Sequence, residues 1–137
     1  MNRRELNMGL QERRAIQTAT ESWLPKRSAE IEQICGKSIP FEIDWESFDG
    51  DLKGIEWLEH NGPHQVGMAL RGLCRDDIGR EAVQQGLSKV ILHNVAEPAA
   101  KQVSLRDGIL ELSGAFAQSP SGRLDHKAIQ ACLEESL

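Results

Sequence analysis

Two histidines four residues apart are the first feature of this sequence that could do chemistry. His60 and His64 stand in the segment WLEHNGPHQ, with Glu59 beside the first of them. On a continuous helix this spacing puts both imidazoles on one face, where a metal ion could bridge them. An Asn-Gly-Pro segment separates them, however, and a glycine followed by a proline is typical of a helix end and the start of the next helix. The pattern favours a corner between two helices with exposed histidines. A metal site would remain if the corner turned both rings toward Glu59, although zinc would want a third ligand and none is evident nearby.

A row of carboxylates is the second candidate site. Glu42, Asp44 and Glu46 alternate along a predicted strand, and Asp49 and Asp51 follow it. On a strand such residues share one face at steps of about 7 Å, where they could bind a cation or a basic partner, or raise the pKa of one carboxyl group. A calcium-loop register starting at Asp49 fails, because a lysine and a histidine fall at ligand positions. The alternative is a solvated face that also deters edge-to-edge pairing of the sheet.

Trp57 is the third candidate, because it follows the acidic segment closely in sequence. It falls at the margin of the apolar stripe of its predicted helix, so peripheral core packing is one interpretation. An exposed tryptophan beside an acidic patch would instead be a candidate hot spot for binding a partner.

The sequence contains no catalytic motif of the GxSxG, P-loop or GxGxxG kind. Its three cysteines, Cys35, Cys74 and Cys132, are odd in number, far apart and not in a CxxC arrangement. This argues against a disulfide framework or a zinc ribbon, and we expect reduced thiols in the core. Cys74 lies on an apolar helical stripe, which would raise the pKa of its thiol and make it inert as a nucleophile.

The charge is unevenly distributed. Residues 1–27 carry six basic and three acidic side chains, whereas residues 28–137 carry ten basic and eighteen acidic ones. The acidic body should repel nucleic acid, since phosphate binding needs a basic face. The sequence contains no run of 18 apolar residues, so it predicts no membrane span. No apolar segment follows the basic N-terminus, as one would in a signal peptide. We therefore expect a cytoplasmic protein that binds neither membranes nor nucleic acid.

The elements that must position these residues follow from hydrophobic periodicity. A length of 137 residues fits one domain over 1–137, of which residues 1–7 could be disordered. The predicted order is one or two helices, a strand, three helices, a three-strand meander and a helix, which gives a two-layer α+β domain with a four-stranded, mostly antiparallel sheet. Pro25 either kinks the first helix or starts a second one, which Gly36 ends. The predicted elements span the helix 8–24 with its extension to 36, the strand 39–46, the three helices in 51–87, the strand 88–95, the hairpin 101–114 and the helix after Asp125.

Two strand features make specific predictions. Asp107–Gly108 predicts a two-residue type I′ turn, which would pair Arg106 with Ile109 and place Val103, Leu105, Leu110 and Leu112 on one face. The strand SKVILHNV is apolar on both faces, so we expect it to be central. Its second face would need covering by helices or by a partner subunit.

These features favour a small acidic protein-interaction module without catalytic activity and without a cofactor, comparable to an adaptor or an immunity protein by size and charge alone. Its predicted contact surface is the acidic segment with Trp57, its predicted partner is a basic protein, and self-association through the sheet is a related possibility. Two alternatives stay open. One is a metal-dependent hydrolase with His60, His64, Glu59 and Asp44 as its site, and the other is a small-ligand-binding domain with a pocket between sheet and helices.

Overall fold

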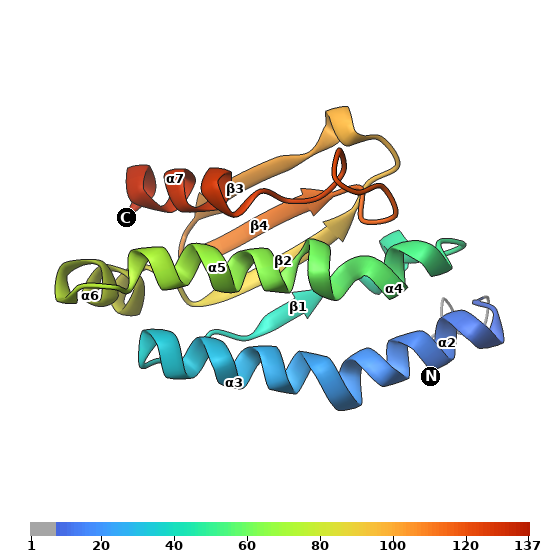
Figure 1. The fold of residues 1–137 in the computed structure, drawn as a ribbon, viewed down its shortest axis with the longest axis horizontal. Helices are drawn as coiled ribbons and strands as arrows, with labels where there is room; N and C mark the ends of the chain where they lie inside the picture. The colour runs from blue at the N-terminus through green and yellow to red at the C-terminus, as the bar shows by residue number, and fades with distance from the viewer. Residues whose placement is uncertain (1–7) are drawn as a thin grey trace.

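A computed structural model describes residues 8–137, in which four strands form one sheet and the long helices lie across one of its faces (Figure 1). The prediction for residues 1–7 lies outside the described residues. The protein is a single α+β domain, as predicted. In chain order its elements are α2 (Leu10–Thr18), the π-helical turn η1 (Ala19–Trp23), α3 (Leu24–Cys35), β1 (Phe41–Ile43), the 3-10 turn η2 (Trp45–Phe48), α4 (Leu52–Asn61), α5 (Pro63–Leu73), α6 (Asp77–Gly86), β2 (Lys89–Asn94), the 3-10 turn η3 (Pro98–Ala100), β3 (Gln102–Arg106), β4 (Ile109–Gly114) and α7 (His126–Ser136).

The sheet is mixed, so the prediction of a mostly antiparallel sheet with a three-strand meander is wrong. The strand order is β1-β2-β4-β3, with β1, β2 and β4 parallel and only β3 antiparallel to its neighbour. The segment after β2 carries the chain to the edge of the sheet, and the hairpin then returns β4 to the centre. β4 is the more apolar arm of the hairpin, since Leu110 and Leu112 are fully buried whereas Val103 and Leu105 are only partly so. Placing β4 beside β2 therefore buries more apolar surface than a meander would.

The hairpin itself forms in the predicted register. Arg106 pairs with Ile109, Leu105 with Leu110 and Val103 with Leu112. Asp107 and Gly108 have φ angles of 54° and 80°, the positive values that a type I′ turn requires. The four apolar residues of the hairpin pack on the helix-covered face, so this prediction is confirmed.

The N-terminal helices form one nearly continuous rod (Figure 1). Pro25 lies in the first turn of α3, directly after the π-helical turn η1. Proline has no N–H and its ring crowds the carbonyl one turn earlier, and the wider π turn is a common adjustment at such a point. Gly36 ends α3 with φ 74°, as predicted.

The first strand is shorter than predicted. β1 covers Phe41–Ile43 only, and the chain turns at Asp44 into the 3-10 turn η2. The carbonyl of Asp44 accepts hydrogen bonds from the backbone N–H and the hydroxyl of Ser47, at 3.1 and 2.6 Å. This turn sends Phe48 into the core, where its ring stacks on Phe116 with centroids 5.7 Å apart. The period-two pattern therefore overestimated the strand, because a buried aromatic residue ended it.

The predicted helices over 51–87 are present as α4, α5 and α6, and Asp76 caps α6 through the backbone N–H of Gly79. β2 lies between β1 and β4, so the prediction of a central strand is also confirmed. Among the described helices, none has the length and apolar character needed to cross a membrane.

Candidate functional site

The corner between α4 and α5 keeps the two histidine rings together. α4 ends at Asn61 and Pro63 begins α5, as predicted, and Gly62 between them has φ −127° and ψ −89°. The rings of His60 and His64 stack with centroids 5.3 Å apart and planes at 15°. The helix break therefore leaves the two rings in contact, which the sequence left open. Burial, reinforced by the nearby charge of Arg27 and by His60, lowers the pKa of His64 below its ordinary value.

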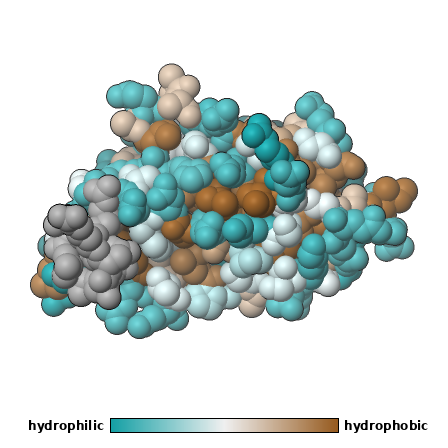
Figure 2. Space-filling model, turned by 180° about the vertical axis from the view of Figure 1, so that it is seen from behind, coloured by the Kyte–Doolittle hydropathy of each residue, from teal (hydrophilic) through white to brown (hydrophobic). Residues whose placement is uncertain are grey.

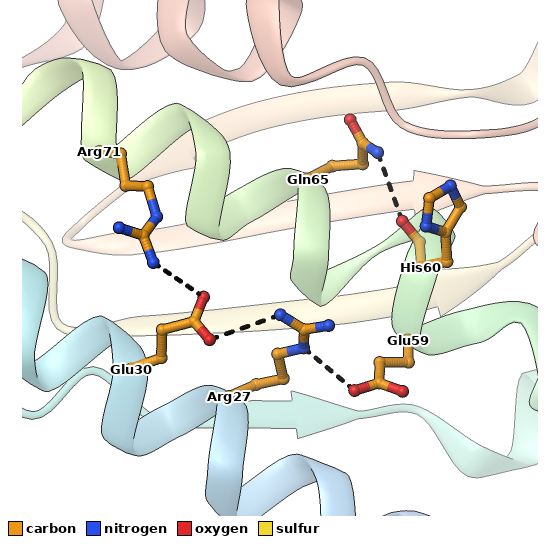
Figure 3. Close-up of polar contacts among 6 residues, drawn as sticks. All are labelled: Arg27, Glu30, Glu59, His60, Gln65 and Arg71. Carbon is orange, nitrogen blue, oxygen red and sulfur yellow. Dashed lines mark hydrogen bonds and ion pairs between the residues drawn. The ribbon is translucent and has the colours of Figure 1, made fainter.

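Glu59 does not complete a metal site at this corner. Its carboxylate accepts a hydrogen bond from Arg27 Nε at 3.1 Å, and Arg27 Nη1 also contacts Glu30 at 3.5 Å (Figure 3). Glu30 in turn pairs with Arg71 at 3.4 Å, so the network ties α3 to α4 and α5. In residues 8–137 no group of three or more histidine, cysteine, aspartate or glutamate side chains is arranged to hold a metal ion.

The predicted row of carboxylates is divided among structural roles. Glu42 pairs with Lys89 at 3.5 Å, and Asp44 contacts His93 Nδ1 at 3.0 Å. Asp51 caps α4 by accepting from the backbone N–H of Gly54 at 2.9 Å. The remaining two acidic residues, Glu46 in η2 and Asp49 after it, are exposed. The expectation that Glu42, Asp44 and Glu46 share one strand face is wrong for Glu46, because β1 ends before it.

Asn94 at the end of β2 fixes the acidic segment in place. Its side-chain Nδ2 donates to Asp51 Oδ2 at 2.9 Å and to the carbonyl of Ser47 at 3.2 Å. Its Oδ1 accepts from the backbone N–H of Phe116 at 3.4 Å. A lone asparagine at a strand end carries no sequence signal for this role, so sequence reasoning missed it.

The face of the sheet opposite the helices is open to the surface. The strand register puts Glu42, Ile91 and Glu111 in one row across this face and Lys89 and Ile109 in the next. Figure 2 shows apolar surface in the middle of this side, framed by hydrophilic residues. Ile91 and Ile109 are only half-buried, so the predicted cover over the second face of β2 is not supplied by the helices.

His93 lies on the same open face between two carboxylates. Besides Asp44 at its Nδ1, its Nε2 lies 3.6 Å from Glu111 Oε2. Because side chains alternate along β2, His93 lies on the same face of the sheet as Ile91. Nothing in the sequence indicates its two acidic neighbours. With its charged residues paired across the strands, this face resembles a solvated surface more than a reaction centre.

Trp57 forms one wall of a groove on the outer side of α4. Lys53, Glu56, Trp57 and His60 lie three and four residues apart and therefore share one helix face. The Trp57 side chain is 42% exposed, and Lys53 Nζ lies 4.5 Å from the centroid of its ring. The groove has a volume of about 450 Å³ and lies between α4 and the loop after β4, with the lining residues Glu56, Trp57, His60, Asn61 and Ser119.

Asn61 holds the two walls of the groove together. It is 1% exposed, and its Nδ2 donates to the carbonyl of Phe116 at 2.9 Å. Its backbone carbonyl accepts from the N–H of Leu124 at 3.2 Å. Its side-chain Oδ1 has no hydrogen-bond partner within the described part of the chain. A buried unpaired acceptor costs about 1–3 kcal/mol. Sequence reasoning treated Asn61 only as part of a helix end.

Comparison with protein-family models, with curated proteins and with solved structures found no match for this chain.

Proposed function

We propose that this protein is a small interaction module that binds a basic segment of a partner protein in the groove beside Trp57. The observation that carries the proposal is the half-exposed Trp57 ring in the lining of a groove that Glu56 also lines. Trp57 belongs both to the binding surface predicted from the sequence and to this groove. The rest of the proposed contact surface lies on α4 and the loop after β4 and not on the β1 segment.

The chemistry of the lining favours a partner that donates hydrogen bonds and carries positive charge. The carboxylate of Glu56 is an acceptor only. The face of an indole ring attracts cations, and the position of Lys53 over Trp57 is an example within the chain itself. A lysine or arginine side chain from a partner can contact both the Glu56 carboxylate and the Trp57 ring.

The negative charge of the surrounding surface also favours a basic partner. Residues 28–137 carry eighteen acidic and ten basic side chains, and Glu46 and Asp49 are exposed in the segment just before α4. Such a field raises the association rate of a basic partner at low salt. Asp44 contacts His93 and Asp51 contacts Asn94, so we assign these two carboxylates to positioning the segment and not to contacting the partner.

The test is binding to an array of peptides that contain lysine and arginine, each matched with a peptide in which glutamate replaces the basic residues. Basic peptides should bind better than their acidic counterparts, and the Trp57→Ala variant should weaken that binding. A tryptophan side chain offers about 150–250 Å², of which 42% is exposed in the free protein. At about 25 cal/mol per Å², covering that area contributes about 2 kcal/mol, which is roughly a 30-fold change in Kd.

The matched control is Ile78→Ala, which removes an apolar side chain that is 84% exposed on α6. It should leave peptide binding unchanged, while Glu56→Gln should weaken binding more at low salt than at high salt. Equal binding of basic and acidic peptides, or an unchanged Kd for Trp57→Ala, would show that the groove is not the contact surface.

A further inference from the structure

Two cysteines far apart in sequence meet at the end of the helical layer opposite the groove. Cys35 is the last residue of α3 and Cys74 directly follows α5, and their Sγ atoms lie 3.4 Å apart. Both are free thiols. We propose that Cys35 and Cys74 form an oxidation site, which a low-molecular-weight disulfide converts into an intramolecular disulfide.

The backbone around this pair is held by several contacts. α3 and α5 pack against each other along their length (Figure 1). The carbonyl of Cys35 accepts from Gln84 Nε2 at 2.8 Å, and Lys37 Nζ donates to the carbonyls of Gln84 and Leu87 at 2.7 and 2.9 Å. A disulfide bond is about 2.0 Å long, so closing the gap requires only a small side-chain movement.

The two thiols differ in access to solvent, and this sets the order of the reaction. Cys35 is 0% exposed, whereas Cys74 is partly exposed at the end of its helix. A reagent from solution therefore meets Cys74 first. Cys35 is reached only from within the protein, and it lies in contact with the Cys74 sulfur.

The chemistry is two successive thiol–disulfide exchanges. In the first, the Cys74 thiolate attacks one sulfur of the reagent RS–SR, the reagent's S–S bond breaks, and RS⁻ leaves and takes up the proton that Cys74 released. In the second, the Cys35 thiolate attacks Cys74 Sγ, the bond from Cys74 to SR breaks, and the second RS⁻ takes up the proton from Cys35. Two protein thiols are oxidised and one reagent disulfide is reduced to two thiols.

Burial makes both steps slow at neutral pH. It raises the pKa of Cys35 to about 12 and also raises the pKa of Cys74, although the positive charge of Arg80 opposes both shifts. Because the thiolate is the attacking form, the reaction should accelerate as the pH rises.

The test uses the full chain, reduced and then incubated with glutathione disulfide. After acid quenching, denaturation and alkylation, mass spectrometry should show a Cys35–Cys74 cross-linked peptide and a single alkylated thiol at Cys132. The Cys132→Ser variant should form the same cross-link. The Cys35→Ser variant should stop at the first exchange and accumulate glutathione on Cys74.

Three results would overturn the proposal: a cross-link that includes Cys132, a lasting glutathione adduct on Cys74 in the unchanged chain, or three free thiols after prolonged incubation at raised pH. The Cys74→Ser variant gives a second measurement if Cys35→Ser does not fold. With native circular dichroism retained, its Cys35 should stay unmodified. A glutathione adduct on Cys35 in that variant would refute the inferred order of attack.

Discussion

Replacing Asn94 by alanine should destabilise the protein by more than its position at a strand end suggests. The side chain makes one hydrogen bond to the carboxylate of Asp51 at 2.9 Å, one to the carbonyl of Ser47 at 3.2 Å and a long one from the N–H of Phe116 at 3.4 Å. A hydrogen bond to a charged group contributes about 1.5–3 kcal/mol and a neutral one about 0.5–1.5 kcal/mol. Asn94 is only half-buried, so water can replace part of these hydrogen bonds in the variant. We therefore expect the free energy of unfolding to fall by about 2–3 kcal/mol.

Urea denaturation followed by circular dichroism measures this loss. With an m-value of about 1.5–2 kcal/mol/M, the midpoint should fall by roughly 1–2 M. The matched control is Gln102→Ala, which truncates an exposed amide on β3 and should change the free energy of unfolding by less than about 0.5 kcal/mol.

A loss for Asn94→Ala as small as that of the control would refute the reasoning. It would mean that the acidic segment 44–51 is not held by Asn94. Asp51 would then be as available to a partner as the sequence alone suggested, and the case for placing the binding surface beside Trp57 would weaken.

Three further predictions follow from the same structure. Oxidation to the Cys35–Cys74 disulfide should raise the free energy of unfolding by about 4 kcal/mol, because it closes a loop of 39 residues. Urea denaturation of the oxidised and the reduced protein measures this increase, and the Cys74→Ser variant should show no difference between the two conditions. His64 has a lowered pKa in the folded state, so the unfolded chain binds the proton first as the pH falls below about 6.5. The free energy of unfolding should therefore decrease from that pH down to the folded-state pKa, and a titration of stability against pH should show a smaller decrease in His64→Gln. Gly108→Ala should cost about 1–2 kcal/mol, because its φ of 80° strains a residue with a Cβ; a thermal melt that matches the unchanged chain would contradict this.

Features set by neighbouring residues could be predicted well. The register of the hairpin follows from the turn that Asp107 and Gly108 favour and from the alternation on either side of it. The end of α3 at Gly36 and the start of α5 at Pro63 depend on local backbone chemistry in the same way.

The candidate site could be predicted only in part. Trp57 was identified from its residue type and its nearness to an acidic segment, and the structure places it in the lining of a groove. The alternation predicts a longer strand and therefore a row of carboxylates, whereas β1 ends at Ile43 and Glu46 lies in η2. The contacts of Glu42, Asp44 and Asp51 are made with Lys89, His93 and Asn94, which approach from β2. Sequence spacing does not contain such contacts.

By itself, the sequence determined the α+β class, the helix ends, the hairpin register and the excess of negative charge, because each depends on residues close together in the chain or on composition. Only the tertiary structure decided the strand order, since the choice of whether β3 or β4 pairs with β2 compares buried areas across the whole sheet. It also decided that Asn61 joins Trp57 in one groove and that Cys35 meets Cys74. These contacts come from the packing of helices and loops separated by dozens of residues, and that packing is fixed by the core as a whole and not by any single segment.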